Sequence, residues 1–287
     1  MLSQTIIHNI EQQIGAPIKQ TRSVGGGCIS ETYILTTKEN HSLFLKTQSQ
    51  PTDMFLKESH GLNELQKAKC IRIPKVVHVS QNFLLLECIN ISHHSHSTSF
   101  FEKFGRQLAQ LHRHTNEDYG FFEDNYIGST LQKNVPQSKN WALFYFRNRV
   151  LFQYKLAGQH GYATPEFVRC FLNLEKKVEN ILGSVNETAS LLHGDLWSGN
   201  FLVDENDDPV LIDPAAYYGH RETDLAMTKL FGGFPDAFYH SYREEFPPLD
   251  GWEEREPLYQ LYHILNHLNL FGTSYYNQAI ALMKVYM

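Results

Sequence analysis

Short hydrophobic runs, separated by polar residues and glycines, fill residues 1–90. The runs that predict strands are residues 17–24, 32–37, 43–46, 73–79 and 83–86. Residues 51–69 predict a helix instead, because Phe55, Leu62 and Leu65 recur at spacings of seven and three and so share one helical face. We therefore expect a five-stranded, mostly antiparallel sheet with one helix.

From residue 99 onward the hydrophobic spacing becomes that of helices. The helical runs are residues 100–114, 141–156, 165–182 and 256–271, with a C-terminal helix over 275–287 that packs either on the core or on a partner. Residues 189–213 are strand-like and interrupted by loop residues. The pattern predicts an α+β protein with a small antiparallel-sheet lobe over residues 1–90 and a larger, mainly helical lobe over residues 91–287.

The composition is that of a globular protein, with 42% hydrophobic and 20% charged residues among 287. The net charge of −6 argues against a nucleic-acid partner, because nucleic-acid binders usually carry a basic excess. The chain has no apolar run of about 18 residues, so we expect no membrane partner or span. Residues 1–14 lack the basic start and apolar block of a signal peptide, which predicts a cytoplasmic protein.

The strongest chemical signal is the segment His-Gly-Asp-Leu-Trp-Ser-Gly-Asn at residues 193–200, with Asp213 downstream. Asp195 and Asn200 have the spacing of the kinase catalytic loop, in which four residues separate an Asp from an Asn. The Asp of that loop is the catalytic residue, which accepts a hydrogen bond from the attacking hydroxyl. Mg²⁺ prefers oxygen ligands, so we assign Asn200 and Asp213 to the metal. Together these residues predict Mg²⁺-dependent phosphoryl transfer from ATP.

Lys46 ends the third predicted strand, where kinases place the lysine that holds the α- and β-phosphates of ATP. Glu58 lies twelve residues later on the predicted helix. We expect an ion pair between these two residues that positions the ammonium group. The alternative partner is Glu64 on the same helix, which would have to face the site instead.

The glycine-rich segment between the first two predicted strands is a candidate loop over the nucleotide. Backbone N–H groups of Gly25, Gly26 and Gly27 can approach phosphates closely, and the Ser30 hydroxyl can add one contact. Cys28 adjoins these groups, which suggests an oxidation-sensitive loop, although a small residue in a turn is the simpler interpretation.

The two parts of the chain join just after the fifth predicted strand. Glu87 and Ile89 lie at this junction, where kinases bind adenine through backbone groups. Residues 93–96, His-His-Ser-His, follow shortly after. A polar surface linker explains this cluster better than a metal site, because imidazole ligands need a fixed scaffold.

These motifs together resemble the fructosamine kinase (ketosamine-3-kinase) family, within the wider group of aminoglycoside phosphotransferases and choline kinases. The segments that carry the resemblance are residues 25–30, 124–130, 192–200, 213–215, 218–222 and 261–267. The H-G-D and D-P motifs are shared by the wider group, whereas the Leu-Trp-x-Gly-Asn continuation and the G-G-G-C-I-S loop are more specific to fructosamine kinases. The resemblance spans essentially the whole chain and implies a two-lobed, protein-kinase-like fold that uses ATP and Mg²⁺.

The resemblance also implies the substrate, which composition and spacing do not. That substrate is a ketosamine, either small or attached to a protein, which is phosphorylated on its O3 hydroxyl. The phosphorylated adduct then breaks down and frees the amine, so the implied activity is deglycation. We place the acceptor beside Asn125, Thr130, Trp197 and His220, and His220 could equally anchor its loop.

Four further residues near these motifs need an interpretation. Ser198 stands where the family often has glycine, and this departure affects the expected access of substrate. Trp141 and Phe144 either pack in the core or line the acceptor cleft. Asp224 precedes a Leu-Ala pair and predicts a helix N-cap.

Two alternative functions remain at this point. One is a kinase of the same group that acts on another small hydroxyl acceptor, such as choline, homoserine or an aminoglycoside. Residues 119–134 contain only two carboxylates, Glu123 and Asp124, which disfavours a site for a cationic drug. The other alternative is a binding-only pseudokinase, which would lack a catalytic group, and all the expected groups are present. Neither the oligomeric state nor the preferred ketosamine follows from the sequence.

Overall fold

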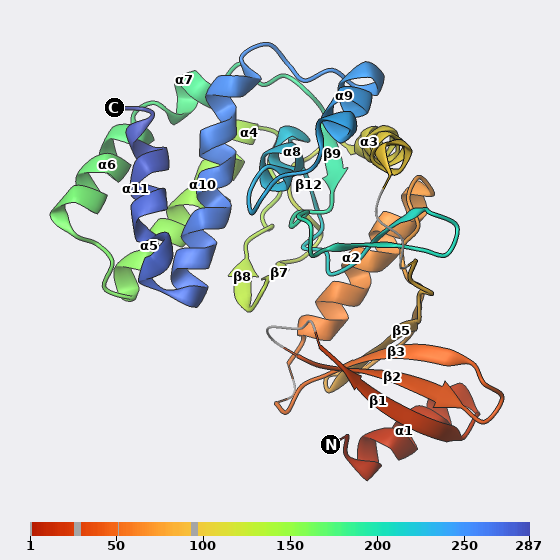
Figure 1. The fold of residues 1–287 in the computed structure, drawn as a ribbon. Helices are drawn as coiled ribbons and strands as arrows, with labels where there is room; N and C mark the ends of the chain where they lie inside the picture. The colour runs from red at the N-terminus through yellow and green to blue at the C-terminus, as the bar shows by residue number, and fades with distance from the viewer. Residues whose placement is uncertain (1, 26–29, 51, 93–96) are drawn as a thin grey trace.

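The computed structural model describes residues 2–25, 30–50, 52–92 and 97–287. An N-terminal lobe built on a sheet lies beside a larger C-terminal lobe built mainly of helices (Figure 1). The expected α+β, two-lobed architecture is therefore confirmed. Some residues that received an interpretation from the sequence lie outside the described residues. They are Gly26, Gly27, Cys28 and the cluster at residues 93–96.

The N-terminal lobe contains the predicted five-stranded sheet. Its strands are β1 (Ile18–Val24), β2 (Glu31–Thr37), β3 (Ser42–Thr47), β4 (Val76–Val79) and β5 (Phe83–Glu87). The strand order is β1-β2-β3-β5-β4, and every neighbouring pair is antiparallel. Lys46 on the central strand β3 pairs with Thr32 on one side and Leu84 on the other, so the middle of the sheet holds its backbone in place.

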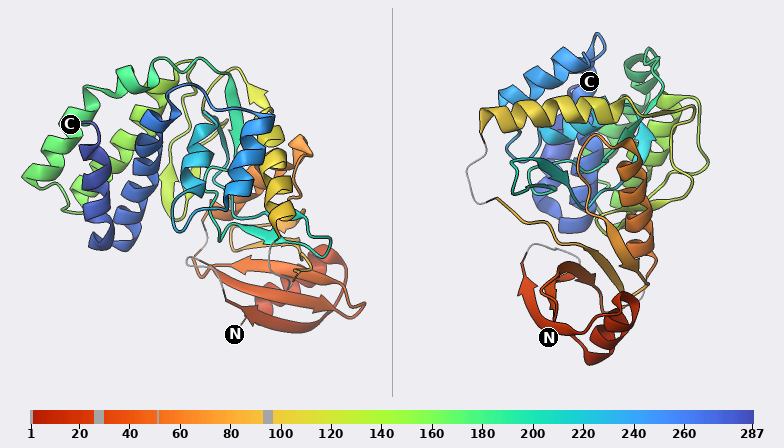
Figure 2. Two further views of the ribbon diagram at one scale, coloured as in Figure 1. Left: turned by 45° about the horizontal axis from the view of Figure 1, so that its top comes forward. Right: turned by 90° about the vertical axis from the view of Figure 1, so that its right-hand side faces the viewer.

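A helix precedes this sheet, α1 (Gln4–Ile14), which the hydrophobic pattern did not predict. The Ser3 hydroxyl caps its first turn, and Gly15 ends it in the left-handed conformation with φ 66°. Ile10 is fully buried against Leu45 and the other inward residues of the sheet. The helix thus covers the face of the sheet turned away from the C-terminal lobe (Figure 2).

Helix α2 (Met54–Ala68) corresponds to the predicted helix of this lobe. Its expected apolar residues Phe55, Leu62 and Leu65 are all buried. They belong to a hydrophobic cluster that joins β5 to the catalytic segment of the C-terminal lobe. Figures 1 and 2 show α2 extending from the sheet along the C-terminal lobe, so this helix contacts both lobes.

The C-terminal lobe is mostly helical, with short strand pairs between the helices. Its helices are α3 (Thr98–His112), α4 (Trp141–Tyr145), α5 (Leu151–Gln159), α6 (Pro165–Glu175), α7 (Val178–Leu182), α8 (Glu222–Thr228), α9 (Asp236–Glu245), α10 (Trp252–Phe271) and α11 (Tyr276–Lys284). A π-helical turn, Phe146–Val150, joins α4 to α5, and a 3-10 turn, Thr273–Tyr275, precedes α11. The short strands are β6 (Thr115–Asn116), β7 (Asn125–Ile127), β8 (Thr130–Gln132), β9 (Ala189–Leu192), β10 (Phe201–Val203), β11 (Pro209–Leu211) and β12 (Tyr217–Gly219).

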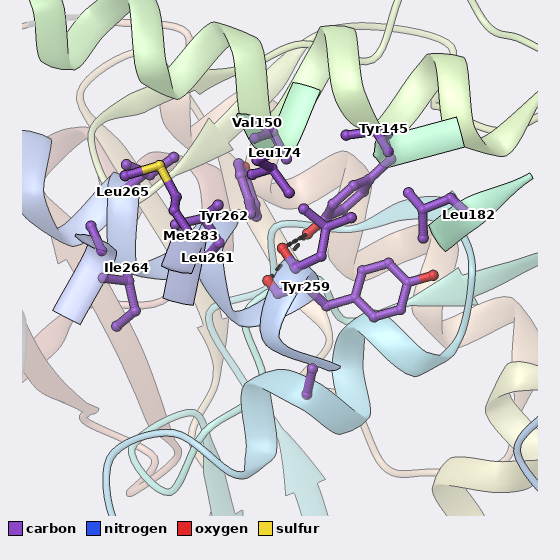
Figure 3. Packing of buried hydrophobic residues seen from close by; sticks show 14 of the residues in the cluster. Tyr145, Val150, Leu174, Leu182, Tyr259, Leu261, Tyr262, Ile264, Leu265 and Met283 are labelled. Atoms are coloured by element: carbon purple, nitrogen blue, oxygen red, sulfur yellow. Dashed lines mark hydrogen bonds between the residues drawn. The ribbon is translucent and has the colours of Figure 1, made fainter. Parts of the chain in front are cut away.

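The core of this lobe lies among α4, α5, α6, α10 and α11 (Figure 3). Val150, Leu265 and Met283 are fully buried within it. Because Ala279 and Met283 of α11 are part of this core, the C-terminal helix packs on its own chain rather than extending free. Trp141 is also buried here, which resolves its two interpretations in favour of the core.

The strand pairs bring the predicted catalytic segments together. Strand β9 pairs antiparallel with β12, and β10 pairs antiparallel with β11 in the expected hairpin. Asp195 follows β9 and Asp213 follows β11, so both lie at the edge that faces the N-terminal lobe. Within the described ranges, no helix is long and apolar enough to cross a membrane.

Candidate active site

A cavity between the lobes contains most of the predicted site residues. We call it the interlobe cavity. Its lining residues are Ser30, Lys46, Gln48, Met54, Phe55, Lys57, Glu58, Asn125, Tyr126, Ile127, Gly128, Asp195, Trp197, Asn200, Asp213, Pro214, Ala215, Asn266, His267, Leu270 and Phe271. The interlobe cavity thus brings Lys46 together with the predicted catalytic and metal-binding residues Asp195, Asn200 and Asp213. It also contains two of the predicted acceptor residues, Asn125 and Trp197.

The expected ion pair of Lys46 is present. Lys46 Nζ lies 2.6 Å from Glu58 Oε1 and also contacts Asp213 Oδ1. Burial alone would lower the pKa of Lys46, but the carboxylates of Asp213 and Glu58 outweigh it, and the pKa lies above its ordinary value. Lys46 is therefore charged at neutral pH. Glu64 faces elsewhere, toward Tyr218 and Lys67, so it does not compete for this lysine.

Gly194 lets the catalytic loop cross the strand end that carries Asp213. Its φ is +83°, and a Cβ at this position would lie 2.1 Å from the backbone oxygen of Ala215. His193 joins the same two segments, because its Nε2 donates to the Ile212 backbone oxygen at 2.9 Å. Burial lowers the pKa of His193, so its ring is neutral and structural. Only glycine at residue 194 allows this close crossing.

Asp195 lies in the cavity with an environment suited to proton transfer. Burial raises the pKa of Asp195 to about 7, with contributions from the charges of Asp213 and Asp224, while a hydrogen bond from Asn200 opposes the rise. Asn200 Nδ2 donates to the backbone oxygen of Asp195 at 2.7 Å and to its Oδ2 at 3.2 Å. The pair predicted from the four-residue spacing is thus in contact.

The expected magnesium ligands fit a cation by their chemistry. Asn200 directs its amide nitrogen at Asp195, which leaves the amide oxygen as the atom available to a metal ion. The side chain of Asp213 is 44% exposed, in the cavity. Asp213 also has φ 54°, an unfavourable conformation for a residue other than glycine. Two residues after Asp213, the backbone N–H of Ala215 donates a hydrogen bond to the backbone oxygen of His193. This hydrogen bond helps to hold Asp213 in its conformation.

Asp224 is not a helix N-cap, so the sequence-based expectation for this residue is wrong. It lies inside α8, where its carboxylate accepts the backbone N–H groups of His193 at 2.8 Å and Gly194 at 2.9 Å. His112 Nε2 lies 3.2 Å from the same carboxylate. Burial would raise the pKa of Asp224, but its hydrogen bond with His112 and its other partners hold it below the ordinary value. The aspartate is therefore an ionised anchor for the catalytic loop.

The predicted nucleotide loop lies partly outside the described residues. Gly26 and Gly27 belong to that part, and so does Cys28. Gly25 is exposed at the end of β1, and Ser30 lines the interlobe cavity. The assignment of these residues to the nucleotide stays a prediction.

The junction residues Glu87 and Ile89 do not line the interlobe cavity. Glu87 instead binds Arg72 at 2.7 Å and accepts the backbone N–H of Lys75 at 3.2 Å. Ile89 is buried. Their predicted contact with adenine through backbone groups stays a prediction.

The four predicted acceptor residues separate into two groups. Trp197 and Asn125 line the cavity, and the buried Asn125 also donates to the Ala216 backbone oxygen at 2.8 Å. Thr130 and His220 are buried and do not line it. His220 Nδ1 lies 2.8 Å from the Tyr259 hydroxyl and its Nε2 lies 3.1 Å from Glu187, too poorly aligned for a hydrogen bond. Of its two interpretations, this geometry favours an anchor for the loop.

One end of the cavity is formed by residues that received no individual role from the sequence. Asn266, His267, Leu270 and Phe271 come from the last turns of α10. Their spacing of three and four places them on one side of the helix. This spacing was the available signal, but it does not distinguish a cavity wall from a core face.

Comparison with known proteins agrees with the resemblance of the motifs. A family model described as fructosamine kinase matches residues 2–287. A probable ketoamine kinase of Synechocystis is 40% identical over 288 aligned positions, which cover 98% of this chain and 95% of that protein. A chloroplastic protein-ribulosamine 3-kinase of Arabidopsis thaliana is 36% identical, and the match covers 94% of this chain and 83% of the relative.

A solved structure supports the same relationship in three dimensions. A putative fructosamine-3-kinase from Thermobifida fusca superposes with a TM-score of 0.90 at 30% identity. The match covers 99% of this chain and 98% of the other. The similarity therefore extends over both lobes and includes every segment that forms the interlobe cavity.

Proposed function

Because the chain belongs to the fructosamine kinase family, we propose that it transfers the γ-phosphate of ATP to the O3 hydroxyl of a ketosamine. Membership of the family makes it a phosphotransferase with an alcohol group as acceptor. The observation that carries the proposal is the placement of Asp195 in the same cavity as the Lys46–Glu58 pair and Asp213. The lysine pair, the predicted base and the predicted metal ligands thus share one cavity, which supports catalysis over a binding-only role.

In the catalytic step, the residues that hold the nucleotide and the residue that activates the acceptor hydroxyl have different roles. Lys46, fixed by Glu58, holds the phosphates of the nucleotide, as the corresponding lysine does in kinases. Asp195 accepts the proton of the attacking hydroxyl. A general base works best when its pKa lies near the operating pH, and the pKa of Asp195 is raised to about 7. Asp224 fixes the position of the catalytic loop, because its carboxylate accepts two backbone N–H groups of that loop.

Asn200 and Asp213 are the residues that would hold Mg²⁺. When bound, Mg²⁺ neutralises charge on the phosphates during transfer. Lys46 Nζ also contacts Asp213 Oδ1, so the lysine and the metal would share this carboxylate.

The charges near the acceptor residues disfavour an acceptor with several ammonium groups, such as an aminoglycoside. The carboxylate of Glu123 is bound to Lys57 and His60, and that of Asp124 is bound to Lys133. Neither carboxylate is free to bind an ammonium group of an aminoglycoside or of choline. Glu123 and Asp124 do not line the interlobe cavity, and the carboxylates that do line it are the three already assigned to the catalytic site, Glu58, Asp195 and Asp213.

An acceptor panel tests this proposal. ATP consumption would be measured with fructosyl-lysine, ribulosyl-lysine, a glycated protein, choline and an aminoglycoside, each with Mg²⁺ and with excess chelator. We expect turnover with the ketosamines alone and its loss in chelator. Turnover with choline alone would assign the chain to another acceptor, and ketosamine turnover in chelator would remove the metal assignment. The comparison of free and protein-bound ketosamines also decides which form of the substrate is preferred.

The expected cytoplasmic location stays a prediction.

A further inference from the structure

Helix α2 presents a row of polar residues to the C-terminal lobe. The row is Asp53, Lys57, His60 and Glu64, at successive spacings of four, three and four, so all four lie on one side of the helix. Each makes a side-chain contact with a residue of the C-terminal lobe. None of these contacts involves the nucleotide lysine, which Glu58 reaches from the same helix.

The central contact of this row is made by Glu123. Its Oε2 accepts from Lys57 Nζ at 2.7 Å, and its Oε1 accepts from His60 Nδ1 at 2.6 Å. The side chains of Glu123 and Lys57 are only 19% and 18% exposed, so the pair is shielded from water more than a surface pair is. Asn134, which is fully buried, donates to the backbone oxygen of Glu123 at 3.1 Å. The carboxylate is therefore fixed on a rigid part of the C-terminal lobe.

The ends of the row are held in the same way. The Tyr126 hydroxyl donates to Asp53 Oδ1 at 2.7 Å, and the Tyr218 hydroxyl donates to Glu64 Oε1 at 2.9 Å. Tyr126 belongs to β7, which lines the interlobe cavity, and it follows Glu123 by three residues. The acceptor side of the cavity is thus bound directly to the helix that carries Glu58.

Close packing reinforces this row of polar contacts. A Cβ at Gly61 would lie 3.3 Å from the Cβ of Ala216 and 3.7 Å from Cγ of Pro214. Both residues lie within three positions after Asp213 in the chain. Glycine at this position lets α2 approach the segment that presents the catalytic carboxylate. The position of α2 is consequently defined by the C-terminal lobe as well as by its own sheet.

We propose that Glu123 is a positioning residue for phosphoryl transfer, which fixes α2 so that Glu58 holds Lys46 at the nucleotide. The proposal rests on the function proposed above for Lys46. It also explains why Glu123 lies next to β7 in the chain but is bound to α2 and not free to bind an acceptor. Glu123 therefore connects the segment that contains β7 to Lys46 by a continuous series of contacts that passes through α2 and Glu58.

The test compares Glu123→Gln with Glu256→Gln. Glu256 is a matched control, because its Oε2 also lies 2.7 Å from a lysine, Lys229, its Oε1 accepts from Gln260, and its side chain is likewise 19% exposed. Its contacts lie entirely within the C-terminal lobe and outside the interlobe cavity. We expect Glu123→Gln to lower kcat about tenfold at saturating ATP and ketosamine, within the usual range for coupled residues. Glu256→Gln should retain wild-type kcat, with a melting temperature lowered at least as much.

A double-mutant cycle separates positioning from other effects. If Glu123 acts through Glu58, then Glu58→Gln combined with Glu123→Gln should be no slower than Glu58→Gln alone. Additive losses, or wild-type kcat in Glu123→Gln, would overturn the proposal. Glu123→Asp, which keeps the charge, should recover part of the loss.

The same variants should be assayed for ATP hydrolysis without an acceptor. This reaction also needs a positioned Lys46, so it reports on α2 whichever acceptor the wild-type enzyme uses. If the wild type hydrolyses ATP and Glu123→Gln is slowed, but ketosamines are not phosphorylated, then the acceptor assignment fails while the positioning role stands. Equal hydrolysis by both proteins would overturn the positioning role itself.

Discussion

At the scale of single residues, the site depends on opposing effects on Asp195. Burial and the neighbouring negative charges of Asp213 and Asp224 favour the protonated acid, whereas the hydrogen bond from Asn200 favours the carboxylate. The outcome is a pKa of about 7, well above the ordinary value of 3.8. A group with this pKa can accept a proton from a hydroxyl at neutral pH and release it afterwards.

Asp195→Asn should therefore lose most turnover while it keeps the shape of the site. Because general-base groups contribute roughly 10²- to 10⁴-fold, we expect kcat to fall by that factor. ATP affinity should change little, since Lys46 and its partners are untouched. Steady-state kinetics together with an ATP titration check both statements. A kcat close to that of the wild type would show that Asp195 is not the base.

Sequence spacing predicted only some of these residues. The Asp195–Asn200 contact follows from a motif of fixed spacing, the Lys46–Glu58 pair follows from a strand end and the next helix, and both contacts are present. The role of Asp224 could not be predicted, because its partners are backbone N–H groups that carry no sequence signature. The same holds for Glu123, whose partners lie more than sixty residues away in the chain.

At the scale of secondary-structure elements, Glu187 connects two segments that frame the catalytic loop. It precedes β9, and its carboxylate binds Arg221 Nη2 at 2.8 Å and Nε at 3.0 Å in the segment between β12 and α8. Burial would raise the pKa of Glu187, but His220 and Arg221 lower it from 4.5 to about 2. The Arg221 guanidinium also stacks 3.7 Å above the Phe246 ring. These contacts hold α8 and its Asp224 against the loop.

This shift predicts a loss of stability in acid. Because the pKa of Glu187 is lower in the folded state, its contribution is complete above about pH 4.5 and is lost as pH falls toward 2. Between pH 7 and pH 3, the wild type should lose about 2 kcal/mol of unfolding free energy that Glu187→Gln, with no charge to titrate, does not lose. Urea unfolding at both pH values measures the difference. Glu253→Gln, at an exposed position on α10, is the control and should keep the wild-type dependence. An equal dependence in Glu187→Gln would contradict the assignment.

The elements that sequence pattern predicted are those with one polar and one apolar side. The strands of the N-terminal lobe and helices α2 and α3 have such a pattern, and they occur where expected. Helix α8 was expected only as a helix that begins after Asp224, and its true bounds, Glu222–Thr228, could not be predicted because every one of its residues is buried, so no periodic pattern exists. The run 165–182 breaks into α6 and α7, a division that its hydrophobic spacing did not indicate.

At the scale of the whole molecule, function depends on how the two lobes meet. One hydrophobic cluster includes residues of α2, β5, α3 and the catalytic segment, so the lobes share a core rather than a mere linker. This shared core places Lys46 of one lobe beside Asp213 of the other. The hydrophobic pattern predicted the two lobes, but it cannot predict how they meet, because each lobe has its own pattern. The boundary at residue 90 stays a prediction, since α2 contacts both lobes.

The position of phosphate on the product shows most directly whether the enzyme is a ketosamine-3-kinase. Fructosyl-lysine would be incubated with ATP, Mg²⁺ and the enzyme, and the product examined by phosphorus and carbon NMR before it decomposes. We predict a single phosphomonoester on O3, followed by release of free lysine, and no product with Asp195→Asn. Phosphate on another hydroxyl, or ketosamine that stays unmodified while choline is phosphorylated, would contradict this account.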